Sequence, residues 1–215
     1  MKRGEVSAVL FDFGGVFTPS PFDVAESLGA ELGAAPGQLL EIVFGPYHED
    51  TAHPWHRLER GEITLVEARD AILDLGRAAG IDADPFRLFA RMAGGEGARA
   101  PMVERARRLL AAGYRTALVT NNAHEFRDAW RRLVPADELF EVIVDSSEVG
   151  VRKPDPRIFE LALERLGGIA PTQALFLDDA ASNVEAAQRL GIRSVLVRPD
   201  LKDALGTLDA LLSKP

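Results

Sequence analysis

Five short segments of the 215-residue chain are continuously apolar, and they constrain the fold more than any other feature. Strands buried on both faces of a sheet show such runs, whereas strands with one solvent-facing side alternate between apolar and polar residues. Helical patterns stand between most of the runs, and this order predicts an open α/β fold with a parallel sheet and right-handed crossovers. The five runs are Val6–Phe11, Thr116–Val119, Val142–Val144, Ala174–Leu177 and Ser194–Val197.

Start and stop signals mark the helices of this fold. An apolar stripe predicts a helix over Pro101–Ala112. Asp155 is a candidate N-cap for a helix over Pro156–Leu166, because Pro suits the first helical position. Ser182–Glu185 has the pattern of a capping box, and the helix that it opens is expected to stop at Gly191.

The interval after the first run breaks the alternation of strands and helices. It contains no convincing buried strand, but Thr64–Glu67 is a capping box and Asp84–Pro85 is a second helix start. We therefore expect a mostly helical cap inserted after the first strand, with the glycine-rich residues 94–97 as its return hinge. The expected division is a core of residues 1–17 and 96–215 and a cap of residues 18–95.

Composition excludes several classes of protein. The chain has 33 acidic residues against 25 Lys and Arg, a net charge of −8, which argues against binding to nucleic acid or anionic membranes. Cysteine is absent, which removes disulfides, thiolate metal sites and cysteine nucleophiles. No apolar run approaches the roughly 20 residues that span a bilayer. We expect a cytoplasmic monomer or homodimer that binds neither nucleic acid nor membrane.

Polar residues follow the apolar runs where each predicted strand ends. Asp12 follows the first run, Thr120–Asn121 the second and Asp178–Asp179 the fourth, while Lys153, the one lysine far from both termini, comes shortly after the third. Any one of them could be an ordinary turn residue. Ligands of doubly wound sheets bind beyond the carboxyl ends of the strands, so agreement at four ends predicts a site there.

These residue types favour phosphoryl transfer. Crowded carboxylates repel one another unless a cation lies among them, and oxygen ligands without Cys or His favour Mg²⁺. A metal-bound carboxylate can act as a nucleophile and form an aspartyl-phosphate. Lys153 and the Thr120 hydroxyl would hold phosphoryl oxygens, and Gly14–Gly15 would let the backbone approach the phosphate. These residue types therefore predict a Mg²⁺-dependent phosphoryl-transfer site.

In this order the residues resemble the motifs of the haloacid dehalogenase (HAD) superfamily, whose members are mostly Mg²⁺-dependent phosphatases. Asp12 resembles the motif I nucleophile, Thr120 the motif II hydroxyl, Lys153 the motif III lysine and Asp178–Asp179 the motif IV acidic pair. The resemblance implies a three-layer Rossmann-like core with a helical C1-type cap inserted after the first strand. The implied function is Mg²⁺-dependent hydrolysis of a small phosphorylated metabolite. The cap would close over the site and select the substrate.

Within the superfamily, the chain is most similar to one subgroup. That subgroup includes the N-terminal phosphatase domains of soluble epoxide hydrolases and bacterial glucose-1-phosphate phosphatases. The stretches that carry this similarity are Asp12–Val16, Trp55–Thr64 and Leu177–Asn183.

The resemblance also implies a metal-binding or phosphate-binding role for each site residue. The metal ligands would be Asp12, the Gly14 carbonyl, Asp179 and Asp178, the last through water or by orienting Lys153 instead. The phosphoryl group would be held by Thr120, Asn121, Lys153 and Gly15.

One position departs from the family pattern. Most of its phosphatases have a second Asp two residues after the nucleophile, a general acid of the kind typically worth about 10²–10⁴-fold in rate, and here that position is Gly14. Three explanations follow: a substrate with a good leaving group, a proton supplied from the cap, or a slow or vestigial enzyme. His titrates near neutral pH, so the cap residues His48, His53 and His56 are candidates for that proton.

Two other functions fit the same motifs. Metal-independent 2-haloacid dehalogenases also lack the second Asp, but their motif IV lacks a paired carboxylate. A non-catalytic protein that binds phosphate or a partner is the alternative from a different class.

Overall fold

A computed structural model describes residues 5–94 and 97–212 of the chain. The sheet has the strand order β3-β2-β1-β4-β5, and every neighbouring pair is parallel. This confirms the expected parallel sheet. The strands are β1 (Ala8–Phe11), β2 (Arg115–Thr120), β3 (Val142–Asp145), β4 (Ala174–Asp178) and β5 (Arg193–Leu196).

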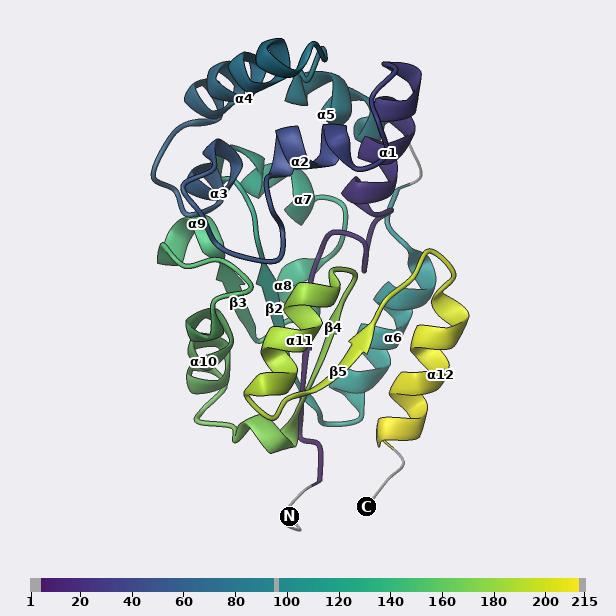
Figure 1. The fold of residues 1–215 in the computed structure, drawn as a ribbon. Coiled ribbons are helices and arrows are strands. Elements are labelled where there is room, and N and C mark those ends of the chain that lie inside the picture. The colour runs from purple at the N-terminus through teal and green to yellow at the C-terminus, as the bar shows by residue number, and fades with distance from the viewer. Residues whose placement is uncertain (1–4, 95–96, 213–215) are drawn as a thin grey trace.

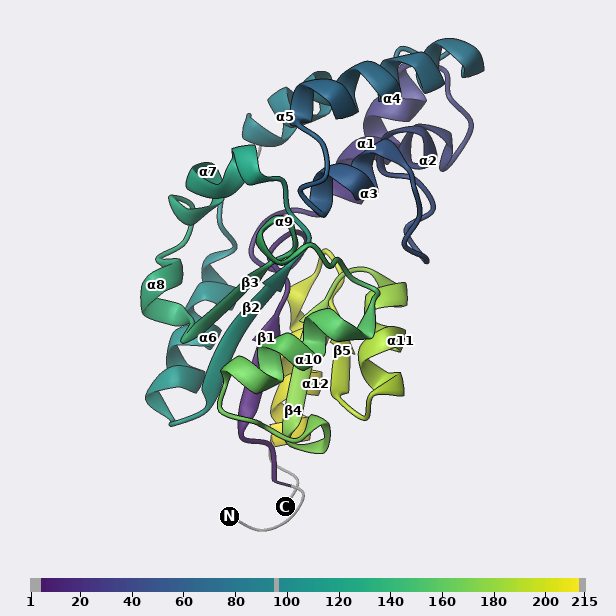
Figure 2. The ribbon, with the colours of Figure 1, turned by 90° about the vertical axis from the view of Figure 1, so that its left-hand side faces the viewer.

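Helices cover both faces of the sheet, because successive strand residues point to opposite sides. Val9 and Phe11 pack against α6 (Ala100–Ala111), α8 (Ala136–Leu139) and α12 (Leu201–Leu212). Ala8 and Leu10 face α10 (Pro156–Arg165) and α11 (Ala181–Arg189) on the other side. Figure 2 shows the sheet between these helices. The three-layer Rossmann-like core is confirmed.

Short helical segments connect the larger elements. None of the helices in the described residues is both long and apolar enough to cross a membrane. The short segments are η1 (His124–Phe126), α7 (Arg127–Arg131), α9 (Ser146–Val149) and η2 (Pro171–Gln173).

The chain between β1 and α6 contributes five helices and no strand among its described residues. We call residues 21–93, which carry these helices, the insertion. Its side chains, among them Leu28, Phe44, Trp55 and Ile72, form a buried cluster that also includes Ala123 from the loop after β2. Figure 1 shows these helices above the ends of the strands, on the side opposite the two termini. The helices are α1 (Pro21–Glu31), α2 (Gln38–Phe44), α3 (Pro54–Glu59), α4 (Leu65–Ala79) and α5 (Pro85–Ala93).

The predicted helix starts in the insertion are confirmed. Thr64 caps α4 in a reciprocal capping box with Glu67, and Asp84 caps α5 by accepting from the Phe86 amide. The predicted domain boundary between residues 95 and 96 lies outside the described residues, as do the two middle glycine-hinge positions. The division into a cap of residues 18–95 and a core stays a prediction.

One predicted helix start is wrong. Ser182 was expected to cap α11, but that helix begins at Ala181, and its N-cap Ala180 makes no side-chain cap. The Ser182 hydroxyl donates instead to the carbonyl oxygen of Tyr47, 3.0 Å away in the insertion. The Ser182 hydroxyl, which the local sequence pattern assigned to the start of α11, therefore makes a long-range contact instead.

Candidate active site

Three carboxylates meet where β1 and β4 end. The two strands are parallel neighbours with Phe11 opposite Leu177, and the Asp12 amide donates to the Leu177 carbonyl at 2.8 Å. The next residue along each strand is therefore a carboxylate, and Asp179 follows. One oxygen from each of Asp12, Asp178 and Asp179 lies within 4.8 Å of the others. The structure thus brings together the three acids that were predicted as metal ligands.

Lys153 reaches into this cluster from the loop between α9 and α10. Its Nζ lies 2.6 Å from Asp12 Oδ1 and 2.7 Å from Asp178 Oδ2, and the side chain is almost fully buried. Asp178 also accepts from the Ala180 amide at 2.7 Å and from Asn183 Nδ2 at 3.0 and 3.1 Å. Asp178 is thus held by several donors, which orients it toward Lys153.

The protonation of the cluster reflects its burial and its charge. Burial raises the pKa of Asp12 well above its usual range, against the pull of Lys153 and with the help of the Asp178 charge. Burial and then Asp178 raise the pKa of Asp179 to about 7. Burial lowers the pKa of Lys153, but Asp12 and Asp178 outweigh it and raise that pKa overall. The lysine therefore stays charged.

The donor set fits a hard divalent cation. With all three carboxylates ionised, the cluster would carry two negative charges in excess of the ammonium, and a divalent cation would balance them. The oxygens belong to carboxylates, the ligands that suit Mg²⁺. Ser20 Oγ donates to Asp179 Oδ2 at 2.5 Å.

Thr120 and Asn121 lie at the same edge of the sheet. Thr120 ends β2 and is 4% exposed, and within the described part of the chain its hydroxyl makes only a long 3.5 Å contact with the Asn121 carbonyl. The Asn121 side chain is engaged by the Lys153 backbone: it accepts from the Lys153 amide at 2.7 Å and donates to the Lys153 carbonyl at 3.0 Å. The phosphate contacts expected of both residues stay predictions.

Gly14 and Gly15 have different surroundings. A Cβ added to Gly14 would meet the ring of Pro21 at 3.6 Å, so an apolar group lies beside the position where relatives have their second acid. A Cβ on Gly15, whose φ is +68°, would lie 2.0 Å from Asp179 Oδ2. Glycine at position 15 therefore permits the approach of Asp179. The Gly14 metal contact and the Gly15 phosphate contact stay predictions.

The three cap histidines have different environments. The His48 side chain is 76% exposed. His53 accepts from the Trp55 amide at 3.2 Å at the start of α3. His56 is fully buried, its Nδ1 accepts from the Thr51 amide at 3.0 Å, and burial followed by the Arg152 charge lowers its pKa to about 3. With this pKa His56 is neutral near pH 7. The proton-donor role of His48, His53 and His56 stays a prediction.

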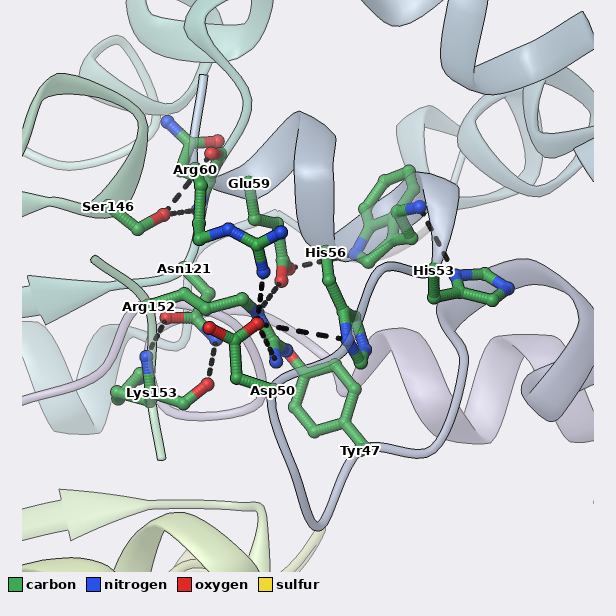
Figure 3. A network of polar contacts seen from close by, with 12 residues as sticks. Tyr47, Asp50, His53, His56, Glu59, Arg60, Asn121, Ser146, Arg152 and Lys153 are labelled. Carbon is green, nitrogen blue, oxygen red and sulfur yellow. Dashed lines mark hydrogen bonds and ion pairs between the residues drawn. The ribbon is translucent and has the colours of Figure 1, made fainter. Parts of the chain in front are cut away.

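Sequence reasoning missed the residue before Lys153. Arg152 is completely buried, and its Nε donates to Glu59 Oε2 of α3 at 2.7 Å. Figure 3 shows Arg152 between Glu59, Asp50 and the ring of Tyr47, with Lys153 beside it. A buried ion pair between the insertion and the loop of the lysine therefore adjoins the site.

A family comparison agrees with this geometry. The model for haloacid dehalogenase-like hydrolases matches residues 6–191. Mouse acyl-CoA dehydrogenase family member 10 is 33% identical over 213 residues, which are 97% of this chain and 19% of that protein. A phosphatase of Mycobacterium tuberculosis is 30% identical over 196 residues, covering 89% of this chain and 87% of the relative. The chain thus spans about a fifth of the mouse relative and most of the bacterial one.

Solved structures share the fold. A HAD family enzyme from Bacteroides thetaiotaomicron, in complex with magnesium and inorganic phosphate, has a TM-score of 0.64 at 22% identity and covers 92% of this chain and 98% of its own. A dehalogenase has a TM-score of 0.67 at 20% identity and full coverage of both chains. At these identities the likeness shows the fold alone.

Proposed function

The chain belongs to the haloacid dehalogenase-like hydrolase family, and from this membership we propose that it is a Mg²⁺-dependent phosphatase of small phosphomonoesters. Its nucleophile would be Asp12, and the reaction would pass through an aspartyl-phosphate. The insertion would act as the cap that excludes water and selects the substrate.

One observation carries this proposal: Asp12, Asp178, Asp179 and Lys153 share a single buried cluster. A dehalogenase without a metal gains nothing from a third carboxylate held within 4.8 Å of two others. In a phosphatase the same arrangement serves two needs, since carboxylates hold a cation and the lysine meets the phosphoryl oxygens.

Asp12, Asp178, Asp179 and the carbonyl oxygen of Gly14 would hold Mg²⁺. When bound, the cation would neutralise the carboxylates, so that Asp12 is ionised, and would draw charge from the phosphoryl oxygens. Asp178 would also keep Lys153 in place through their 2.7 Å contact.

Two displacements at phosphorus complete the reaction. In the first, an Asp12 oxygen forms a bond to phosphorus, the ester P–O bond breaks, and the leaving oxygen takes a proton from water or departs as an anion. In the second, water attacks the phosphorus of the aspartyl-phosphate, releases inorganic phosphate and restores the Asp12 carboxylate. Lys153 and the Thr120 hydroxyl hold the phosphoryl oxygens and stabilise the charge that develops on them.

The leaving group determines which substrates react well. No side chain extends from Gly14, and the nearest atoms to an added Cβ belong to Pro21, so this position supplies no proton. Esters whose alcohol departs as a stable anion are therefore the favoured substrates, because they need little general-acid help.

Hydrolysis of p-nitrophenyl phosphate, with MgCl₂ and with EDTA, tests the proposal. We expect turnover with magnesium that EDTA abolishes, and no halide release from 2-chloropropionate. Chloride release that is insensitive to EDTA would establish a dehalogenase instead. Binding of inorganic phosphate without turnover would establish the non-catalytic alternative.

A further inference from the structure

Arg152 joins the core to the insertion. It lies one residue before Lys153, yet its guanidinium contacts the insertion: Nε lies 2.7 Å from Glu59 Oε2, Nη1 lies 3.3 Å from the Glu49 carbonyl, and the group sits 5.2 Å from the Tyr47 ring centroid. Figure 3 shows Glu59 and Tyr47 beside it. Its Nη1 also lies 3.6 Å from Asp50 Oδ1, so one core side chain is held by four groups of the insertion.

Glu59 is fixed within the insertion by its other oxygen. Oε1 accepts from Trp55 Nε1 at 2.8 Å, and the Trp55 ring packs edge-on against Phe44 at 5.0 Å in the buried cluster of the insertion. The side chains of Glu59 and Arg152 are 3% and 0% exposed. Without Arg152 the Glu59 carboxylate would stay buried with no ion-pair partner among the described residues, so the pair strongly favours a packed interface between insertion and core.

Lys153 receives this constraint through one peptide bond. Consecutive Cα atoms are about 3.8 Å apart, so the anchored Arg152 limits where the Lys153 backbone can lie. Asn121 holds the same backbone from the core side, at the amide and at the carbonyl. The ammonium at the far end of the side chain bridges Asp12 and Asp178.

We propose that Arg152 and Glu59 are positioning residues, which make the placement of Lys153 depend on the packing of the insertion against the core. Its consequence for catalysis rests on the phosphatase function proposed above. The packing of the insertion against the core would then fix the position of the Lys153 ammonium, which contacts the phosphoryl group. The insertion would also enclose the substrate.

Amide hydrogen exchange tests the positioning role without relying on activity. Glu59→Gln keeps the shape of the side chain and an acceptor for Trp55 but removes the nearer of the two carboxylate charges that face Arg152, the other being Asp50 at 3.6 Å. Asp84→Asn is the matched control, because it weakens another ion pair of the insertion. Asp84 accepts from Arg69 at 2.7 and 2.8 Å, and neither residue is among the contacts of Arg152. We expect the Lys153 amide to exchange roughly tenfold faster in Glu59→Gln and to be unchanged in Asp84→Asn.

Kinetics supply the second readout. Glu59→Gln is expected to lower kcat for p-nitrophenyl phosphate by roughly 10- to 100-fold, in line with the cost of about 1 Å of misplacement, with a smaller change in KM. Arg152→Lys, which keeps the charge, is expected to retain more of kcat than Arg152→Met. If Glu59→Gln does not fold, the Arg152→Lys and Arg152→Met pair decides by the same exchange measurement.

The outcomes separate the two proposals. Unchanged Lys153 exchange, or equal acceleration of amides throughout the core in Glu59→Gln and Asp84→Asn, overturns the positioning role. A wild-type chain without turnover overturns the phosphatase, and the exchange data still decide whether Glu59 positions Lys153.

Discussion

Lys153 Nζ lies 2.6 Å from Asp12 Oδ1, so the proposed nucleophile and the only buried lysine of the described residues are in direct contact. The two residues are 141 positions apart in the sequence and come from different loops at one edge of the sheet. The contact keeps the ammonium beside the carboxylate that would be phosphorylated. The same ammonium would then meet the transferred group.

Magnesium is expected to stabilise the protein through the carboxylate cluster. A ligand present at 100 times its Kd contributes about 2.7 kcal/mol, which for a chain of this length raises Tm by roughly 5 °C or more. Asp179→Asn should abolish that shift. Without metal it should melt no lower than the wild type, because burial and Asp178 raise the pKa of Asp179 to about 7 and so oppose its charge. Thermal unfolding with MgCl₂ and with EDTA measures both effects.

The magnesium effect should also depend on pH. The pKa of Asp179 without metal is about 7, so protons compete with the cation below that value. We expect a larger Tm shift at pH 8 than at pH 6, measured at one magnesium concentration. A shift that grows as the pH falls would contradict this assignment of the metal ligands.

The missing acid can be supplied by substitution. Gly14 does not have a positive φ, and an added Cβ would meet only the Pro21 ring at an ordinary 3.6 Å, so Gly14→Asp is sterically feasible. We expect it to raise kcat for an alkyl phosphate relative to p-nitrophenyl phosphate by roughly 10²-fold, the lower end of general-acid catalysis. Gly14→Asn, which has the same shape but no acid, is the control. If the ratio of kcat for the alkyl phosphate to kcat for p-nitrophenyl phosphate is equal in the two variants, position 14 is not the place of the missing general acid.

His56 should make the fold sensitive to acid. Burial and the Arg152 charge lower its pKa to about 3 from the usual 6.5, so the unfolded chain binds a proton between these values that the folded chain does not. Stability is therefore unaffected above about pH 6.5 and falls as the pH decreases below it, by about 1.4 kcal/mol per pH unit. Urea unfolding at several pH values should show a shallower slope for His56→Gln. The exposed His48→Gln is the control, and an equal slope in all three proteins would contradict the prediction.

The sequence predicted that the acidic residues lie together, because their positions depend on strand ends. Carboxyl ends of parallel strands meet at one edge, so residues that follow buried runs, such as Asp12 and Asp178, had to lie close together. The helix starts at Thr64 and Asp84 were equally predictable, since capping depends on residues only two or three positions away.

Contacts between the insertion and the core were not predictable from strand ends or capping patterns. Arg152 and Glu59 are 93 positions apart, and nothing local distinguishes them from a surface arginine and a surface glutamate. Ser182 shows the same limit, because its hydroxyl bonds to Tyr47 rather than to its own helix. Which side of the insertion meets the core depends on tertiary packing, which no local pattern encodes. The one available signal was that Arg152 adjoins Lys153.

A phosphoryl group on Asp12 is the central claim, and peptide mass spectrometry of acid-quenched protein tests it most directly. After mixing with substrate and MgCl₂, the account predicts a phosphate-mass increase on the peptide that contains Asp12. That increase should disappear with EDTA or in Asp12→Asn, and Asp12→Asn should lower kcat by roughly 10⁴-fold or more. Undiminished Mg²⁺-dependent phosphate release by Asp12→Asn, or a phosphoryl group found on another residue, would contradict the account.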